Sequence, residues 1–276
     1  MTFTHIVAAL ILGALQGITE FLPVSSSGHL IFFRDVLGFE LENSLFFDVF
    51  LHLATLCVVL IYFRTDVARL FHGFVQSLKT FDVSQSAQRL SWLILIASLP
   101  AALFGFFFED IVERYARNSG VVILMLILIG VLFLVVDRKN FQPKFELSFL
   151  RLRHVLIIGC AQALALIPGT SRSGITMIAG MTQGLSRRDA AKFSFLLSLP
   201  TVAGAGLKKL IESVMMGLSI EAWMLAIIGF FSAFIFGFLS VAFLMKFLER
   251  HSLHVFAWYR FILAFFIFIY LVRVFL

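Results

Sequence analysis

The sequence predicts an all-α integral membrane protein, with six transmembrane helices plus two re-entrant helical hairpins in an inverted repeat, all within one membrane domain (1–276). Three observations predict this class. Of the 276 residues, 61% are apolar and the mean hydropathy is +1.01. Only 14% are charged, against about 25% in soluble domains. A polar cluster between apolar segments also recurs after 146 residues.

Residues 5–37 are expected to form the first re-entrant hairpin. The apolar run over residues 3–22 is helical in character and is interrupted at Pro23, because proline breaks an α-helix. Residues 25–28, with the letters SSSG, can start a second helix. The segment that follows, 29–37, is too short to cross a bilayer, which takes about 20 residues. A break at membrane depth is tolerated only where it lines a cavity or is buried in protein.

Six apolar runs predict the full spans, and a second polar break lies between the two groups of three. The spans are 45–63, 91–108, 119–136, 193–206, 221–245 and 255–276. The span at 193–206 is short and needs extension at one end. Residues 154–185 repeat the pattern of the first hairpin, with their break at 168–174.

The two halves of the chain correspond at a constant offset. The matched pairs are Gln16 with Gln162, Ser25 with Ser171, Ser27 with Ser173 and Gly28 with Gly174. Repeat one is assigned to residues 1–140 and repeat two to 150–276, each with one hairpin and three spans. An odd number of spans separates the hairpins, so they enter from opposite sides and their tips meet near the midplane.

The basic residues predict the orientation in the membrane. The segments 64–90, 137–153, 186–192 and 246–254 carry 14 Lys and Arg, whereas the alternating segments carry 6. The richer set is expected to be cytoplasmic, which places both termini outside. The formal charge of +6 comes mainly from these short loops, so no nucleic-acid partner is expected. The two cysteines, Cys57 and Cys160, form no disulfide framework or metal spacing.

The two breaks carry the chemistry-bearing residues. Turns rich in Ser, Thr and Gly that open a helix direct backbone N–H groups at one point, and such turns bind phosphates. Arg172 adds a guanidinium that fits phosphate oxygens. The groups expected to bind phosphate are Ser25, Ser27, Gly28, Thr170, Ser171, Arg172, Ser173 and Gly174. Packing of small residues is the alternative for the serines and glycines, and it does not account for Arg172.

Glu20, Ser26, His29 and Arg172 are the candidate catalytic residues. A carboxylate does not bind a phosphate anion directly, so a divalent cation, Mg²⁺ or Ca²⁺, is expected between them. Its ligands would be Glu20 and Gln16, which are four residues apart on one helix face. An ion pair between Glu20 and Arg172 that only joins the halves is the alternative. Ser26 is expected as the nucleophile with His29 as its acid or base, although His29 itself or metal-bound water could attack.

Two stretches resemble the signature motifs of the bacterial undecaprenyl-diphosphatase family, the bacitracin-resistance phosphatases. They are residues 16–29, QGITEFLPVSSSGH, and residues 168–174, PGTSRSG. The likeness covers nearly the whole chain and includes 193–200, FSFLLSLP. The resemblance implies hydrolysis of undecaprenyl diphosphate to the carrier lipid phosphate of peptidoglycan synthesis, with a divalent metal.

The resemblance also implies a bacterial inner-membrane protein whose pocket opens to the periplasm. The family's key residues correspond to Glu20, Ser26, Ser27, His29, Ser171 and Arg172. Position 16 is often Glu in the family and is Gln here, which removes one charge from the metal site. The partners expected are the bilayer and a polyprenyl diphosphate lipid, and a homodimer is left open. A lipid flippase or transporter is the rival function, because inverted repeats with broken helices are also the plan of transporters.

Overall fold

The computed structural model describes residues 2–37, 44–138, 142–215 and 218–275. The other residues, which include parts of three loops used for the orientation and the end of the predicted sixth span, lie outside the described residues. The described chain is helical and contains no β-strand, so the predicted all-α class is confirmed. The α-helices are α1 (Phe3–Phe21), α2 (Ser26–Leu37), α3 (Ser44–Tyr62), α4 (Arg64–Thr80), α5 (Ser86–Ala116), α6 (Ser119–Val136), α7 (Leu152–Ala163), α8 (Arg172–Thr182), α9 (Arg187–Met215), α10 (Ile220–Phe247) and α11 (His254–Phe275). Two short 3-10 helices, η1 (Leu147–Phe149) and η2 (Leu164–Leu166), flank α7.

Six helices in the described ranges are long and apolar enough to cross a bilayer, namely α1, α5, α6, α9, α10 and α11. Of these six helices, α5, α6, α9, α10 and α11 correspond in that order to the second to sixth predicted spans. The predicted span 45–63 corresponds to α3, which meets the same test together with α4 although the two are bent by 85°. The N-terminal helix α1, predicted as one arm of a hairpin, has 19 residues and therefore the length of a span by itself. The chain is a multi-pass membrane protein.

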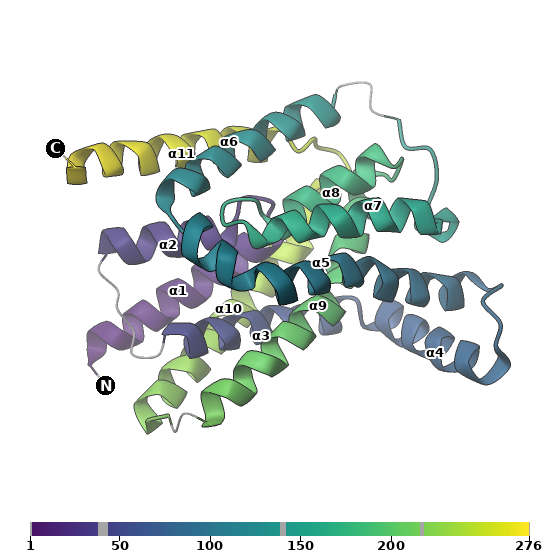
Figure 1. The fold of residues 1–276 in the computed structure, drawn as a ribbon, viewed down its shortest axis with the longest axis horizontal. Helices are drawn as coiled ribbons and strands as arrows, with labels where there is room; N and C mark the ends of the chain where they lie inside the picture. Colours follow the sequence, from purple (N-terminus) through teal and green to yellow (C-terminus); the bar gives the residue numbers. More distant parts are fainter. Residues whose placement is uncertain (1, 38–43, 139–141, 216–217, 276) are drawn as a thin grey trace.

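The two predicted breaks are present, and their tips lie close together in the middle of the molecule. The chain reverses between α1 and α2, and again between η2 and α8 (Figure 1). Residues far apart in sequence meet there, because Ser27 at the start of α2 accepts a hydrogen bond from the N–H of Gly169, 142 residues away. The fold thus brings both polar motifs to one place.

Corresponding helices of the two halves make corresponding contacts. Helix α1 of the first half packs along α10 of the second half, and α7 of the second half packs along α5 of the first. Both contacts are backbone to backbone at matched glycines: a Cβ on Gly13 would overlap the carbonyl oxygen of Gly229, and one on Gly159 would overlap that of Ala97. Small residues allow helices in membranes to approach this closely. The division into repeats 1–140 and 150–276 stays a prediction.

The segment 64–90, expected to be a loop, is mostly helix. The described structure places α4 over Arg64–Thr80, beside α5. Its charged residues alternate with apolar ones around the helix, so no apolar run signals it in the sequence. Trp92 of α5 donates from Nε1 to the Ser77 hydroxyl at 2.9 Å and thereby joins α4 to α5.

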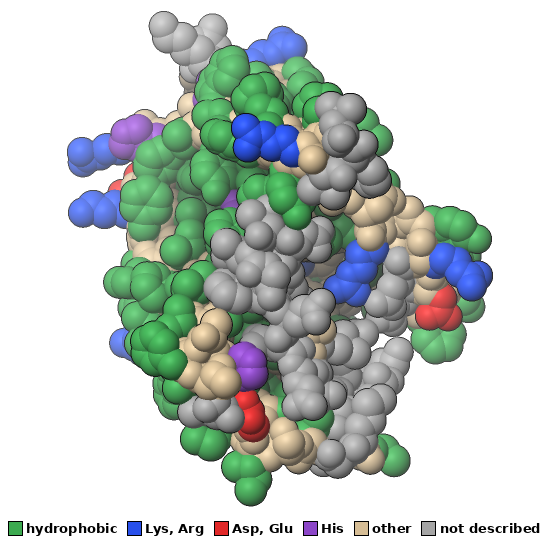
Figure 2. Space-filling view, turned by 90° about the vertical axis from the view of Figure 1, so that its left-hand side faces the viewer, with side chains coloured by type: hydrophobic (Ala, Val, Ile, Leu, Met, Phe, Trp, Pro, Cys, Tyr) green, Lys and Arg blue, Asp and Glu red, His purple; other side chains and the backbone are tan. Residues whose placement is uncertain are grey.

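Both termini lie at one end of the molecule, and the basic connections lie at the other (Figure 1). At the basic end Asp137, 1% exposed, pairs with Arg187 and accepts a hydrogen bond from the N–H of Leu253 at 2.5 Å. This carboxylate joins the end of α6 to the starts of α9 and α11. Among the described side chains of the opposite face, Lys and Arg form scattered groups between hydrophobic side chains (Figure 2).

Candidate active site

The two breaks have the same local geometry. Ser25 and Ser171 both take positive φ values, 76° and 71°, which are uncommon for residues with a side chain. Each hydroxyl then caps the helix that follows, by accepting from the N–H of Gly28 at 3.3 Å and from that of Gly174 at 3.2 Å. Strained backbone of this kind clusters at functional sites. The matched serines therefore fix the direction in which α2 and α8 begin.

Two hydroxyls join one break to the other. Ser27 accepts from the N–H of Gly169 at 3.3 Å, and Ser173 donates to the backbone carbonyl of Glu20 at the same distance. Thr170, the remaining hydroxyl of the second motif, donates to the carbonyl of Ile167 at 2.7 Å. These predicted phosphate-binding hydroxyls thus hold the breaks in place. The N–H groups of Gly28 and Gly174, predicted to bind phosphate, are taken by the serine caps, so the N–H groups just before them, at 26–27 and 172–173, are the natural donors for phosphate.

Glu20 lies at the centre of the site, and its side chain is 7% exposed. Its Oε1 accepts from Nη2 of Arg172 at 2.7 Å, and its Oε2 accepts from the Ser26 hydroxyl at 2.7 Å. The two carboxylate oxygens therefore have different partners: Oε1 has the guanidinium of Arg172, and Oε2 has the hydroxyl of Ser26. The ion pair raised as an alternative is present, but it leaves Nη1 of Arg172 buried and without a partner among the described residues. That edge is available to a phosphate oxygen.

Gln16 and His52 lie beside Oε2 of the Glu20 carboxylate. Gln16 is fully buried, and its amide nitrogen donates to Oε2 of Glu20 at 3.0 Å. The same nitrogen lies 3.2 Å from Nδ1 of His52, which is 3.9 Å from Oε2. The amide oxygen of Gln16 is buried and meets no partner in the described part of the chain. His52 on α3 thus belongs to the site.

His29 is not placed as the predicted base of Ser26. Its Nδ1 lies 2.7 Å from the carbonyl of Ser25, and its Nε2 lies 2.7 Å from the hydroxyl of Tyr259. The imidazole is 2% exposed and stacks on the Tyr259 ring at 5.6 Å. Both ring nitrogens are therefore engaged away from Ser26, whose hydroxyl donates to Glu20 instead. The carboxylate, not the imidazole, has the geometry of a base for Ser26.

Arg260 of α11 is hydrogen-bonded to backbone carbonyls of both breaks. The side chain is fully buried and donates to the carbonyls of Pro23 at 3.1 Å, Gly169 at 2.7 Å and Thr170 at 3.0 Å. Further bonds reach the carbonyls of Met125 and Leu126 on α6. In a trans peptide the C=O and the following N–H point in opposite directions. By fixing the Thr170 carbonyl, Arg260 also fixes the direction of the Ser171 N–H.

Sequence reasoning missed His52, Tyr259 and Arg260. Arg260 carried a signal, because a guanidinium inside an apolar span needs partners, but five backbone carbonyls leave no mark in a sequence. His52 carried a similar signal as an ionisable residue in a span. Nothing in the sequence distinguishes Tyr259 from other aromatic residues near membrane surfaces.

The site offers few oxygen ligands for a divalent cation. In the ranges that the structure describes, no three His, Cys, Asp or Glu side chains lie close enough together to hold a metal. The amide nitrogen of Gln16 faces Glu20, whereas its buried amide oxygen has no partner among the described residues; this oxygen and the Glu20 carboxylate are the donors that the site offers to such an ion. One carboxylate and one amide oxygen suffice where phosphate oxygens of a substrate complete the shell, as is usual for Mg²⁺.

The fold and the site define a class of protein: an all-helical membrane protein in which two broken helices bring a carboxylate, a guanidinium and a serine hydroxyl together in a buried setting. The pattern of the bacitracin resistance protein BacA family matches residues 9–266. The chain belongs to this family.

Curated relatives agree over nearly the full length. The undecaprenyl-diphosphatase of Rubrobacter xylanophilus is 44% identical over 265 residues, which is 94% of this chain and 96% of the relative. The undecaprenyl-diphosphatase of Teredinibacter turnerae is 39% identical over 98% of this chain and 99% of its own. That of Pelobacter propionicus is 42% identical over 94% of each chain.

Proposed function

We propose that this chain is a membrane phosphatase that hydrolyses undecaprenyl diphosphate to undecaprenyl phosphate and inorganic phosphate. The observation that carries the proposal is the Ser26 hydroxyl donating to one oxygen of Glu20 while Arg172 pairs with the other. The relatives are named for this activity. In a bacterium the reaction recycles the carrier lipid of peptidoglycan synthesis and confers bacitracin resistance.

The geometry supports attack by Ser26. Its Oγ forms a bond to the terminal phosphorus while its proton passes to Oε2 of Glu20, 2.7 Å away. The bond from that phosphorus to the bridging oxygen breaks, and undecaprenyl phosphate leaves. Water then attacks the phosphoserine: Glu20 returns its proton to Oγ of Ser26 as the Oγ–P bond breaks, takes a proton from the attacking water, and afterwards releases that proton to solvent. Nη1 of Arg172 and the N–H groups at the starts of α2 and α8 stabilise the charge on the phosphoryl oxygens.

A divalent cation, Mg²⁺ or Ca²⁺, is part of the proposal. Glu20 and Gln16 would hold it, and it would add positive charge next to the phosphate oxygens. Gln16 contributes an amide oxygen where a carboxylate would contribute charge. His29 keeps a supporting role, because its contacts with Ser25 and Tyr259 hold the first break against α11.

The transporter that the inverted-repeat plan left open is not favoured. The relatives are named as phosphatases. A carrier also has no need of a serine hydroxyl directed at a carboxylate beside its anion site. We therefore develop only the hydrolase.

We further infer that the enzyme resides in the inner membrane with the site open to the periplasm. The support is the distribution of Lys and Arg, with 14 in one set of connections and 6 in the other. In this orientation both termini and the substrate diphosphate are on the periplasmic side.

Phosphate release from C55 diphosphate by the purified protein tests the activity. The wild type should release phosphate, and Ser26→Ala should reduce the rate by orders of magnitude, because it removes the nucleophile. Ser148→Ala, a serine in η1 that belongs to neither motif, is the matched control and should keep full activity. No phosphate release by the folded wild type would refute the proposal.

A further inference from the structure

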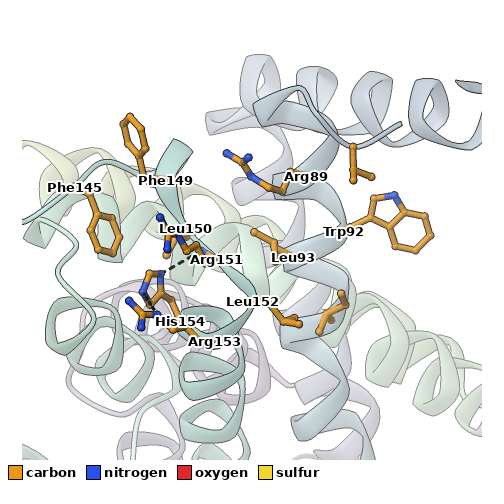
Figure 3. A pocket seen from close by; sticks show the side chains of 12 residues that line it. Arg89, Trp92, Leu93, Phe145, Phe149, Leu150, Arg151, Leu152, Arg153 and His154 are labelled. Atoms are coloured by element: carbon orange, nitrogen blue, oxygen red, sulfur yellow. Dashed lines mark hydrogen bonds between the residues drawn. The ribbon is translucent and has the colours of Figure 1, made fainter. Parts of the chain in front are cut away.

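A cavity lined by apolar and basic side chains lies away from Glu20 and Ser26, at the basic end of the molecule. Its volume is about 750 Å³, and it opens between the start of α5, the segment before α7 and the start of α7 (Figure 3). Arg89 projects from α5 toward the side where Arg151, Arg153 and His154 lie (Figure 3). Three guanidinium groups thus line one cavity, and none of its lining residues is acidic.

These arginines differ from several other cations at the same end. Three of those other cations pair with carboxylates: Arg187 with Asp137, Lys192 with Asp66, and Arg188 with Glu249. In contrast, Arg89 donates to the backbone carbonyl of Ser148 at 2.7 Å, and Arg153 donates to the imidazole of His154 at 3.1 Å.

Neither Arg89, Arg151 nor Arg153 has a carboxylate partner in the part of the chain that the structure describes. Like charges gathered without a counter-charge repel one another, and a bound anion relieves that repulsion. The cavity therefore favours an anionic ligand.

The cavity continues into a lipid-facing apolar surface. Leu152, which lines it, is 51% exposed, and Ile157 further along α7 is 47% exposed. On the neighbouring α5, Leu99 is 55% exposed. Helices α5 and α7 pack side by side, so exposed apolar side chains are present on both helices that form the cavity, and we call these side chains the apolar strip. Such a strip is suited to acyl chains.

We propose that this cavity binds the headgroup phosphate of an anionic membrane lipid. The guanidinium groups bind the phosphate oxygens, and the acyl chains lie along the exposed leucines of α5 and α7. Basic pockets between helix ends at a membrane surface bind lipid headgroups in this way. A free phosphate would use the arginines but would leave the apolar strip unexplained. The proposal does not depend on the reaction at Glu20.

The test is retention of phosphatidylglycerol by the purified full-length protein, counted by native mass spectrometry. Wild-type protein in mixed phosphatidylglycerol and phosphatidylcholine should retain phosphatidylglycerol selectively. The double variant Arg89→Gln/Arg153→Gln should bind it roughly thirtyfold more weakly, from about 1 kcal/mol for each basic residue at a membrane surface. The matched control Arg69→Gln/Arg188→Gln removes the same charge from exposed, carboxylate-paired positions and should bind like the wild type.

Two results would overturn the proposal. Equal retention by the wild type and the double variant would show that the cavity does not select anionic lipid. The second result is binding of inorganic phosphate that displaces all retained lipid and that has the same affinity whether or not lipid is present. This result would assign the cavity to a free anion. Thermal unfolding of each variant in neutral detergent establishes that it is folded. Because lipid retention is read without turnover, the result is independent of the phosphatase assay.

Discussion

At the scale of single residues, the division of the Glu20 carboxylate between two partners explains most of the site. Oε1 is taken by Arg172, so the proton acceptor for Ser26 is Oε2, and both contacts are 2.7 Å. A carboxylate with a cation on one oxygen is held in a single orientation. Oε2 is therefore already in position to accept the proton of Ser26, and no change of the Glu20 rotamer is needed. This is preorganisation of the kind that catalysis requires.

Ser26 and Glu20 should act as one unit. Ser26→Ala and Glu20→Gln should each lower phosphate release by orders of magnitude, and the double variant should be little worse than either single one. A double-mutant cycle on kcat checks this expectation. Additive losses would show that the two residues act in separate steps. His29→Ala serves as the comparison, and coupling of Ser26 to His29 in place of Glu20 would restore the imidazole as the base.

Arg172→Lys should lose most activity although it keeps the charge. A lysine is a point donor and cannot contact Glu20 and a phosphate oxygen with two edges of one planar group. Loss of one charge-assisted hydrogen bond is worth about 1.5–3 kcal/mol, or roughly ten- to a hundredfold in rate. Steady-state kinetics compare it with Arg188→Lys, a surface control. Wild-type turnover in Arg172→Lys would mean that the residue supplies charge alone.

Position 16 should report on the divalent cation. A chelator should abolish turnover, and Mg²⁺ or Ca²⁺ should restore it. Gln16→Glu should lower the cation concentration needed for half-maximal rate, because it adds a charged oxygen ligand next to Glu20. The measurement is a metal titration of the rate in both proteins. Full activity in excess chelator would remove the cation from the mechanism.

At the scale of elements, the features that could be predicted from the sequence are those determined by a few residues that are neighbours along the chain. Pro23 and the serine and glycine turns mark both breaks, and their matched spacing predicted that Glu20 and Arg172 meet across 152 residues. Contacts with backbone atoms or with unremarkable residues could not be predicted. His29 meets Tyr259 across 230 residues, and no pattern announces that pair. The helix α4 was missed because its charges resemble those of a loop.

Arg260 should determine the precision of the site, because one side chain fixes carbonyls of both breaks. Arg260→Lys should lower kcat more than it raises KM. A shorter point donor reaches fewer carbonyls and leaves the Ser171 N–H less well directed, while the Arg172 contact survives. Kinetics with a thermal-unfolding control check this. An Arg260→Lys protein that is folded and fully active would limit Arg260 to filling its cavity.

At the scale of the whole molecule, the basic and termini-bearing ends should face opposite sides of the membrane. In a background with Cys57 and Cys160 replaced, Phe3→Cys should react with an impermeant thiol reagent added to intact cells. Val83→Cys, in the connection between α4 and α5, should react only after lysis. Both residues are exposed, at 81% and 51%. Labelling of Val83→Cys from outside would reverse the orientation and the periplasmic opening.

Arg260 also has a consequence for biogenesis. Helix α11 follows both motifs in the sequence, so the ribosome makes both motifs before it makes Arg260. The guanidinium in turn finds its five carbonyl partners only after both halves have assembled, since an unpaired charge in an apolar segment is unfavourable. Nascent chains shorter than about 260 residues therefore carry every predicted catalytic residue and remain inactive. Synthesis and insertion of α11 are in this way required before the two motifs can form an active site.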